Sequence, residues 1–168
     1  MVNISQRRMF RKGGFTFIET IVVMGIVLIL FSLSVIGFYG IQQETSLNTT
    51  ADVLVTDLRN QQLKAIIGET EGRSTHDAYG VYLGDGVYVL FHGPNYIPTE
   101  STNIPINLEG ATEFDNVTFP GSTIIFASAS GELVGFNQNN NSFDIINTSS
   151  GQHKTITINP YGVVTSLP

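Results

Sequence analysis

The hydrophobic pattern of this chain changes period along its length. Residues 21–39 form a continuous apolar run of nineteen uncharged residues, thirteen of which are Leu, Ile, Val or Phe. After Gln43, apolar positions recur at steps of four and three, which is the period of one face of an α-helix. That face consists of Leu47, Ala51, Leu54, Leu58, Gln61 and Ala65. Because no proline occurs before Pro94 and a stop signal follows at Gly68, the sequence predicts one helix over about residues 15–67.

The remainder of the chain, residues 68–168, has the pattern of a β-rich globular domain. Residues 79–83 and 87–91 are β-rich runs joined by Gly84-Asp85-Gly86, which predicts a hairpin. Residues 92–112 contain three prolines and are expected to form an exposed irregular connection. Further strands are predicted at residues 114–119, 122–127, 132–137, 142–146, 155–159 and 162–165. Short strands at this spacing predict an antiparallel sheet that packs on the apolar face of the helix, so the expected fold class is α+β.

The apolar run is long enough to cross a lipid bilayer. Nineteen helical residues span ~28 Å, against a hydrocarbon core of about 30 Å. Thirteen strongly apolar residues favour insertion by about 4–8 kcal/mol, and a mid-membrane acid costs about 2.5–3.5 kcal/mol. Since Glu19 lies at the edge of the run, insertion is favoured. A secretory signal has a shorter apolar stretch, followed by a small-residue cleavage site, and residues 36–41 offer no such site.

Charge is distributed unevenly between the start of the chain and the rest. The 168-residue chain carries eight Lys or Arg residues and fourteen acidic residues, and four of the cations precede Gly14. The positive-inside tendency holds this basic start in the cytoplasm. Removal of residues 1–14 would leave four cations against fourteen acids, a formal net charge of about −10. Such an acidic body disfavours binding to nucleic acid phosphates, so DNA is not an expected partner. The absence of cysteine excludes disulfides and thiolate metal sites.

The junction between the basic start and the apolar run reads K-G-G-F-T-F-I-E over residues 12–19. It resembles the leader and amino-terminal segment of type IV prepilins and of type II secretion pseudopilins. The resemblance implies that a membrane protease, the prepilin peptidase, cuts after Gly14. It also implies that the new terminus, Phe15, is N-methylated, and that Glu19 is the glutamate at the fifth position of the mature chain. In that family the glutamate is taken to set the axial register as a subunit joins the filament.

An acid at a membrane boundary needs a partner, and an intramembrane ionisable group is a candidate functional group. Cleavage after Gly14 would expose the α-amino group of Phe15, which is a cation near neutral pH. This cation would lie about one helical turn from Glu19 of the same chain, or beside Glu19 of a staggered neighbour. The alternative is that Glu19 only snorkels to the interface or caps the start of the helix, where an acid suits the helix dipole.

A second, weaker resemblance concerns the remainder of the chain. The stretch D-L-R-N-Q-Q-L-K-A-I, residues 57–66, and the closing pattern over residues 155–166 resemble minor pseudopilins of the GspH/FimT type. The two resemblances imply a pilin-like chain with a cleaved leader (1–14), a transmembrane assembly helix (15–43), its amphipathic continuation (44–67) and a β-rich domain (68–168).

The resemblances also imply a function, a location and partners. The chain is expected to be a structural subunit, minor in type, of a pilus or pseudopilus. It is expected to span the inner membrane once, with its leader in the cytoplasm and its carboxy-terminal domain outside. The implied partners are other pilin subunits, the prepilin peptidase, the inner-membrane assembly platform and the lipid bilayer. The alternative, from a different class, is an unprocessed membrane-anchored binding module.

The sequence carries no recognisable catalytic or cofactor motif. His76, His92 and His153 are isolated, and each is expected to be an exposed loop or strand residue rather than a metal ligand. Glu113 and Asp115 share one side of a predicted strand and could help to hold Ca²⁺, although nothing marks them as an acid–base pair. The sequence therefore predicts a protein that is not an enzyme and uses no cofactor.

Overall fold

The structure is a computed structural model that describes residues 14–166, with the backbone alone for residues 35–44 and 166. The chain divides into two compact units, Met1–Tyr39 and Gly40–Pro168. The predicted leader, residues 1–14, lies outside the described residues except for Gly14.

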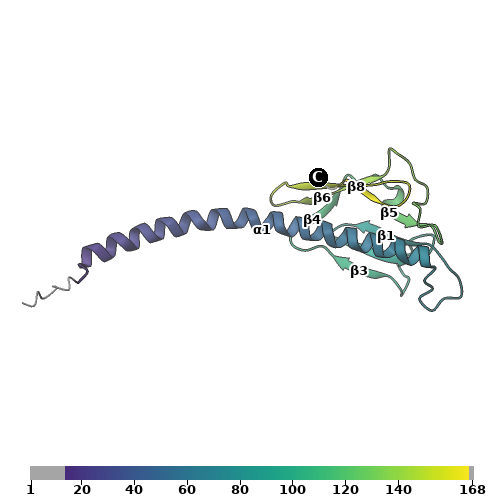
Figure 1. The fold of residues 1–168 in the computed structure, drawn as a ribbon, viewed down its shortest axis with the longest axis horizontal. Coiled ribbons are helices and arrows are strands. Elements are labelled where there is room, and N and C mark those ends of the chain that lie inside the picture. Colours follow the sequence, from purple (N-terminus) through teal and green to yellow (C-terminus); the bar gives the residue numbers. More distant parts are fainter. Residues whose placement is uncertain (1–13, 167–168) are drawn as a thin grey trace, which may run out of the picture. The chain divides into compact units, whose positions relative to one another are not determined.

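A single α-helix, α1 (Phe17–Ile67), runs through 51 residues (Figure 1). It begins two residues after the predicted start and ends at the predicted residue. Gly68 has a positive φ of 66°, and the N–H of Glu69 donates to the carbonyl oxygen of Lys64 at 3.0 Å. This arrangement is a common way to end a helix, because glycine adopts the left-handed conformation without steric cost.

The first sheet of the second unit has the order β3-β2-β1-β5 and is antiparallel throughout. Its hairpin consists of β1 (Tyr79–Gly84) and β2 (Val87–His92), as predicted. Gly84 pairs with Val87, so the loop has two residues, and Gly86 supplies a φ of 65°. A two-residue loop with positive φ matches the twist of the flanking strands.

The other strands of this sheet are β3 (Ile104–Asn107) and β5 (Thr123–Phe126), which follows the short 3-10 helix η1 (Pro120–Ser122). The prediction of an irregular connection over residues 92–112 was wrong at β3, which pairs with β2. β3 lies at the edge of the sheet, where Pro105 pairs with Val89. An edge strand tolerates proline because its outer edge forms no hydrogen bonds with another strand, so the missing N–H of proline is not needed there.

The second sheet has the order β4-β6-β7-β8 and is also antiparallel. Its strands are β4 (Thr112–Asp115), β6 (Ser142–Asn147), β7 (His153–Ile158) and β8 (Val164–Ser166). The predictions at residues 142–146 and 155–159 are confirmed to within two residues. β4 corresponds to the strand predicted at residues 114–119, but it starts two residues before the predicted start and ends before Asn116, whose φ is 48°.

The predicted strand at residues 132–137 was wrong. Leu133 forms only an isolated bridge with Phe126. Gly131 and Gly135 have φ values of 69° and 67°, so the backbone turns on both sides of the bridge and cannot extend a ladder.

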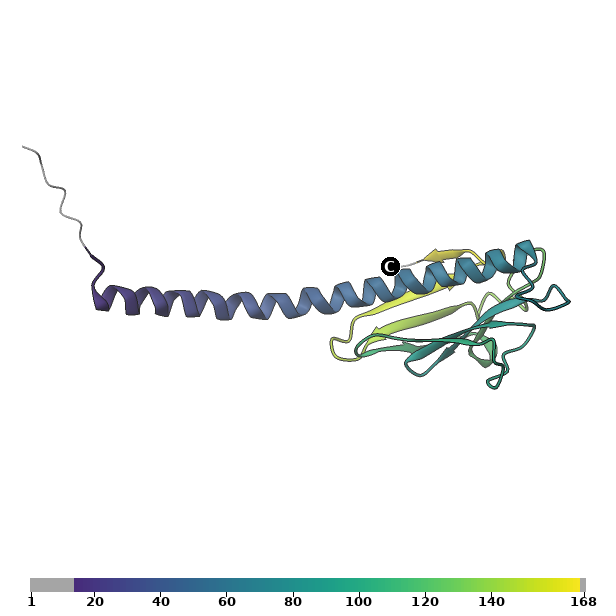
Figure 2. The same cartoon turned by 90° about the horizontal axis from the view of Figure 1, so that it is seen from below.

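The hydrophobic core of the second unit lies between the second part of α1 and both sheets (Figure 2). All six residues of the predicted helix face are buried, with at most 3% of each exposed. The five apolar members of this face pack with buried residues of every strand except β3, β4 and β8, including Tyr79, Tyr88, Phe126, Phe143 and Ile156. The prediction that a sheet packs on this face is therefore confirmed, except that two four-stranded sheets do so in place of one.

Candidate functional site

The start of α1 holds one of the sequence-predicted residues, Glu19, in a hydrogen-bonded arrangement. Gly14 and Phe15 precede the helix and are exposed, and Phe15 is 83% exposed. The backbone N–H of Glu19 donates to Thr16 Oγ1 at 3.3 Å, and the N–H of Thr16 donates to Glu19 Oε2 at 3.4 Å. This reciprocal pair is a capping box, which satisfies two backbone donors that the first helical turn leaves free.

The capping box gives Glu19 a role within its own chain. The carboxylate is exposed and lies in the first turn, where the helix dipole favours an anion. A cap was one of the two roles expected of Glu19, and Thr16 is its partner in that role. The Thr-x-x-Glu spacing immediately before an apolar run is the signal that identifies it.

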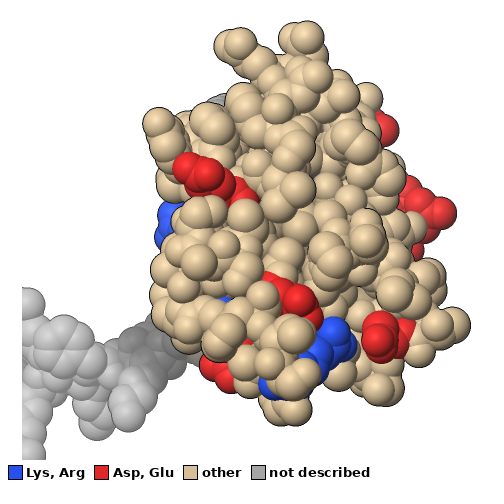
Figure 3. Space-filling view, turned by 90° about the vertical axis from the view of Figure 1, so that its right-hand side faces the viewer, with Lys and Arg blue, Asp and Glu red and all other residues tan. Residues whose placement is uncertain are grey.

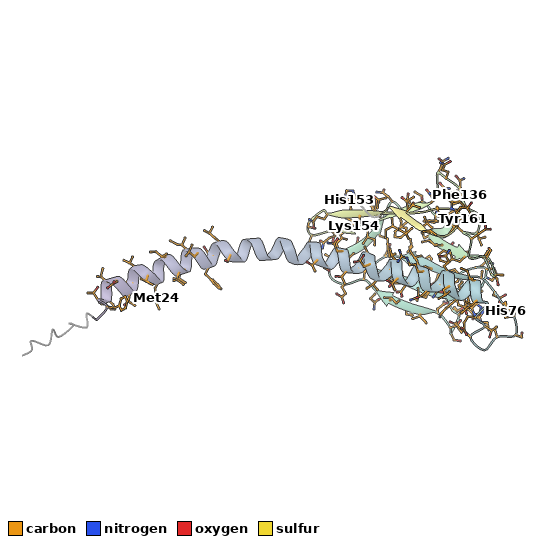
Figure 4. The ribbon with its side chains drawn as sticks, viewed as in Figure 1. Met24, His76, Phe136, His153, Lys154 and Tyr161 are labelled. Carbon is orange, nitrogen blue, oxygen red and sulfur yellow. The ribbon has the colours of Figure 1, made fainter. Side chains whose placement is uncertain are left out.

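The helix that follows is apolar on all sides and unburied. Its window Phe17–Ser34 has a mean hydropathy of 2.4, and none of its 18 residues is buried. Met24, labelled in Figure 4, is one of these side chains and is 65% exposed. A helix that is hydrophobic all round needs an apolar environment. By length and composition, it is able to cross a membrane as an anchor or to act as a signal segment.

A second polar cluster lies where α1 ends and β1 and β2 meet. Lys64 of α1 forms an ion pair with Glu71, at 2.7 Å between Nζ and Oε1. The other carboxylate oxygen of Glu71 lies 3.8 Å from Nδ1 of His92. The His92 ring stacks on Tyr79 with a centroid distance of 4.2 Å and an interplanar angle of 7°. The cluster therefore joins the helix to the hairpin.

The prediction that His92 is exposed was wrong, because only 4% of this residue is exposed. Neither ring nitrogen has a hydrogen-bond partner among the described residues, and each has less than 1 Å² of accessible surface. Burial lowers the pKa of His92, and the nearby Arg73 guanidinium lowers it further, whereas Glu71 opposes this effect. His92 is therefore a neutral, sealed imidazole at neutral pH.

The side chain of Arg73 ties together three segments near His92. Its Nη1 donates to the carbonyl oxygen of His92 at 3.3 Å, and its Nη2 donates to Thr102 Oγ1 at 2.8 Å. A half-open cavity of about 110 Å³ lies beside these groups, and Arg73, Asp77 and Glu100 line it. Because a cation and two carboxylates share the wall, the cavity selects neither a simple anion nor a simple cation.

The remaining candidate ligands are not gathered into one site. His76 and His153 lie at opposite ends of the second unit (Figure 4) and are exposed. Glu113 and Asp115 are exposed on β4, and Asp115 pairs across the sheet with Asp144 of β6. Among the side chains that the structure describes, no three of His, Asp or Glu come together as metal ligands, so the calcium hypothesis gains no support.

The charged surface offers little that would attract a polyanion. On the face drawn in Figure 3, most of the surface is uncharged, with acidic side chains in several separate places and basic ones in few. Beyond Gly14 the chain has four cations, Arg59, Lys64, Arg73 and Lys154. Two of these, Lys64 and Arg73, are engaged by Glu71, Glu100 and Thr102.

Comparisons with known proteins do not assign the chain to a family. No family model, no curated protein and no solved structure matches it.

Proposed function

We propose that this chain is a structural subunit, minor in type, of a type IV pilus or type II secretion pseudopilus. In this proposal the prepilin peptidase removes residues 1–14, and α1 holds the subunit in the inner membrane before assembly. The subunit then joins other pilin subunits through the apolar part of α1 at the assembly platform, while the β-rich domain faces outward. The chain carries out no catalysis and needs no cofactor.

The observation that carries the proposal is the order of parts at the amino terminus. Four cations, a glycine at position 14 and Phe15 precede an unburied apolar helix, whose first turn carries a single carboxylate, Glu19. Gly14 and Phe15 are exposed, so a protease could reach the peptide bond between them. A general membrane anchor has no need for this arrangement.

Glu19 has two separable properties, its charge and its hydrogen bond in the capping box. In the proposal the charge pairs with the α-amino group of Phe15 of a neighbouring subunit, because an unpaired charge is costly in an apolar setting. The capping bond requires only an acceptor oxygen, which glutamine also supplies. A substitution by glutamine therefore removes the charge and leaves the cap.

The first experiment tests processing. The full chain is produced in membranes with a prepilin peptidase, and its amino terminus is determined by mass spectrometry. The expected product starts at N-methylated Phe15. Gly14→Val should block cleavage, whereas Gly25→Val should not, although a Cβ meets no atom within 4 Å at either glycine. An intact Met1 in the peptidase-treated chain would instead favour the unprocessed binding module.

The second experiment tests the role of Glu19 in assembly. Glu19→Gln, Glu19→Ala and Thr16→Ala are compared for membrane insertion and for incorporation into filaments. All three should insert, because the apolar helix is unchanged. Both Glu19 variants should fail to assemble, and Thr16→Ala, which loses the cap hydroxyl but keeps the charge, should assemble. Normal incorporation of Glu19→Gln would remove the charge-pairing role.

A third experiment tests binding to DNA, a partner that the negative net charge of the chain disfavours. The full chain in detergent micelles is passed over immobilised DNA at low salt, where electrostatic binding is strongest. We expect no retention, and clear retention would overturn the exclusion of DNA as a partner.

A further inference from the structure

The segment of residues 68–78, between α1 and β1, covers a histidine that has no partner for a second proton. The neutral ring of His92 lies flat on Tyr79 and is sealed from water. The nearest carboxylate oxygen, Oε2 of Glu71, is 3.8 Å from Nδ1, which is beyond hydrogen-bond distance. An imidazolium needs an acceptor at both nitrogens, and the described residues provide none at either.

The charges around the ring act on its pKa in both directions, since Arg73 and Lys64 disfavour an imidazolium whereas Glu71 and Asp77 favour it. Glu71 already binds Lys64 at 2.7 Å, and Arg73 is held close by its bond to the His92 carbonyl oxygen. The charged and titratable groups come from every element near the ring. They are Lys64 of α1, Glu69, Glu71, Arg73, His76 and Asp77 of residues 68–78, Tyr79 of β1, and Glu100 of the connection after β2.

The covering segment is built to open more easily than the sheets. Residues 69–78 form no strand. Three residues at the start of the segment, Gly68, Glu71 and Gly72, have left-handed φ values of 66°, 48° and 84°. Glu71 is not a glycine, so its conformation is strained. Few buried apolar side chains hold the segment, since the core of the second unit takes none from residues 68–78.

We propose that His92 and residues 68–78 form a pH-sensitive switch. When the imidazole takes up a proton, residues 68–78 open away from the ends of β1 and β2, and water reaches the ring. The closed form excludes the proton and the open form accepts it, so acid shifts the population toward the open form. Opening separates Arg73 from the His92 carbonyl oxygen and exposes Tyr79.

The expected size of the effect follows from proton linkage. Below the ordinary pKa of histidine, about 6.5, the ratio of open to closed forms should rise about tenfold for each unit of falling pH. The rise should stop where the ring becomes protonated in the closed form as well.

The test is amide hydrogen exchange of the full chain in detergent micelles between pH 7.5 and 5.0, with rates corrected for intrinsic exchange. Two amides report on the segment: Arg73 N–H donates to Thr70 at 2.9 Å, and Gly93 N–H donates to Ala78 at 2.7 Å. Their protection should fall about tenfold per pH unit below 6.5. The N–H of Gly162, which donates to the carbonyl oxygen of Asn159 in the turn between β7 and β8, is the internal control and should keep its protection.

Two variants identify the responsible histidine. His92→Phe keeps a ring that can stack on Tyr79 but cannot take a proton, so the pH dependence should disappear. His76→Gln removes the imidazole whose Nδ1 lies 2.6 Å from the Gly68 carbonyl oxygen but keeps a donor, so the pH dependence should remain. The proposal is overturned if both reporter amides keep their protection at pH 5.5, if His92→Phe behaves as the wild type, or if His76→Gln abolishes the effect.

A measurement on the wild-type chain alone keeps the proposal testable if His92→Phe does not fold. The ring protons of His92 should titrate in the same pH range in which the two amides lose protection. A ring that titrates at its ordinary pKa without any change in the exchange of Arg73 and Gly93 would refute the switch.

Discussion

The hydrogen bond between Tyr88 and Asp57 is expected to fasten the amphipathic part of α1 to the first sheet. The Tyr88 hydroxyl donates to Asp57 Oδ2 at 2.6 Å, and Tyr88 is only 1% exposed. Burial and this hydrogen bond raise the pKa of Tyr88, so the phenol remains a donor at neutral pH. Tyr88→Phe removes the hydroxyl and keeps the packing of the ring.

The expected cost follows from the charge and burial of the two groups. A hydrogen bond to a charged group contributes about 1.5–3 kcal/mol to the free energy of unfolding. Because Asp57 is half-buried, water can replace part of the lost bond, and we expect the lower end, about 1.5 kcal/mol. With a urea dependence of about 1–3 kcal/mol per molar, the unfolding midpoint should fall by roughly 0.5–1.5 M.

The assay is urea unfolding of the full chain in micelles, followed by circular dichroism. Tyr82→Phe is the matched control, since its ring stacks on Tyr96 at 4.2 Å but no hydrogen bond of its hydroxyl is found in the described part of the chain. Tyr82→Phe should change stability by less than about 0.5 kcal/mol. A double-mutant cycle with Asp57→Ala, which removes the acceptor, measures the coupling directly. Coupling below about 0.3 kcal/mol would show that the two side chains do not stabilise the unit through this bond.

Three further predictions concern packing and pH. Gly80→Ala should cost about 1–3 kcal/mol by overpacking, because the new Cβ would clash with the ring of Phe91. Phe91→Leu should recover part of this loss in a urea titration. Leu54→Ala, at a fully buried position, should lower the free energy of unfolding by about 2–5 kcal/mol. Val53→Ala, at an exposed position, should change it by under about 0.5 kcal/mol, and equal losses would contradict the assigned helix face. Because the pKa of His92 is lowered in the folded chain, the unfolded chain binds more protons just below pH 6.5, and the free energy of unfolding should fall as the pH drops through this range. His92→Phe should remove this pH dependence in unfolding curves measured at pH 7.5 and 5.5.

The local features of this protein were predictable because their causes lie within a few neighbouring residues. The steps of four and three from Leu47 to Ala65 define one face of α1, and all of its predicted members are buried. The Gly84-Asp85-Gly86 sequence identified the hairpin, since a two-residue loop with positive φ favours glycine. The capping box of Thr16 and Glu19 was equally accessible from the sequence, and only its threonine was overlooked.

The errors arose where pairing partners are far apart in the chain. β3 forms despite Pro105 because β2 offers an edge at which proline is tolerated. Residues 132–137 have the composition of a strand, yet Gly131 and Gly135 turn the backbone on both sides of Leu133. Local propensity could predict neither the presence of β3 nor the absence of a strand at residues 132–137. Whether a segment becomes a strand depends on whether a neighbouring strand can pair with it.

By itself, the sequence determined the order of charges, glycine, phenylalanine and glutamate before an apolar helix, because these residues are neighbours in the chain. Only the tertiary structure decided that His92 is buried. It lies there because α1, residues 68–78 and the hairpin converge on Tyr79, bringing Lys64, Glu71 and the ring together. Whether a residue is buried depends on which distant segments pack around it. The hydrophobic pattern of β2 alone therefore does not predict that His92 is buried.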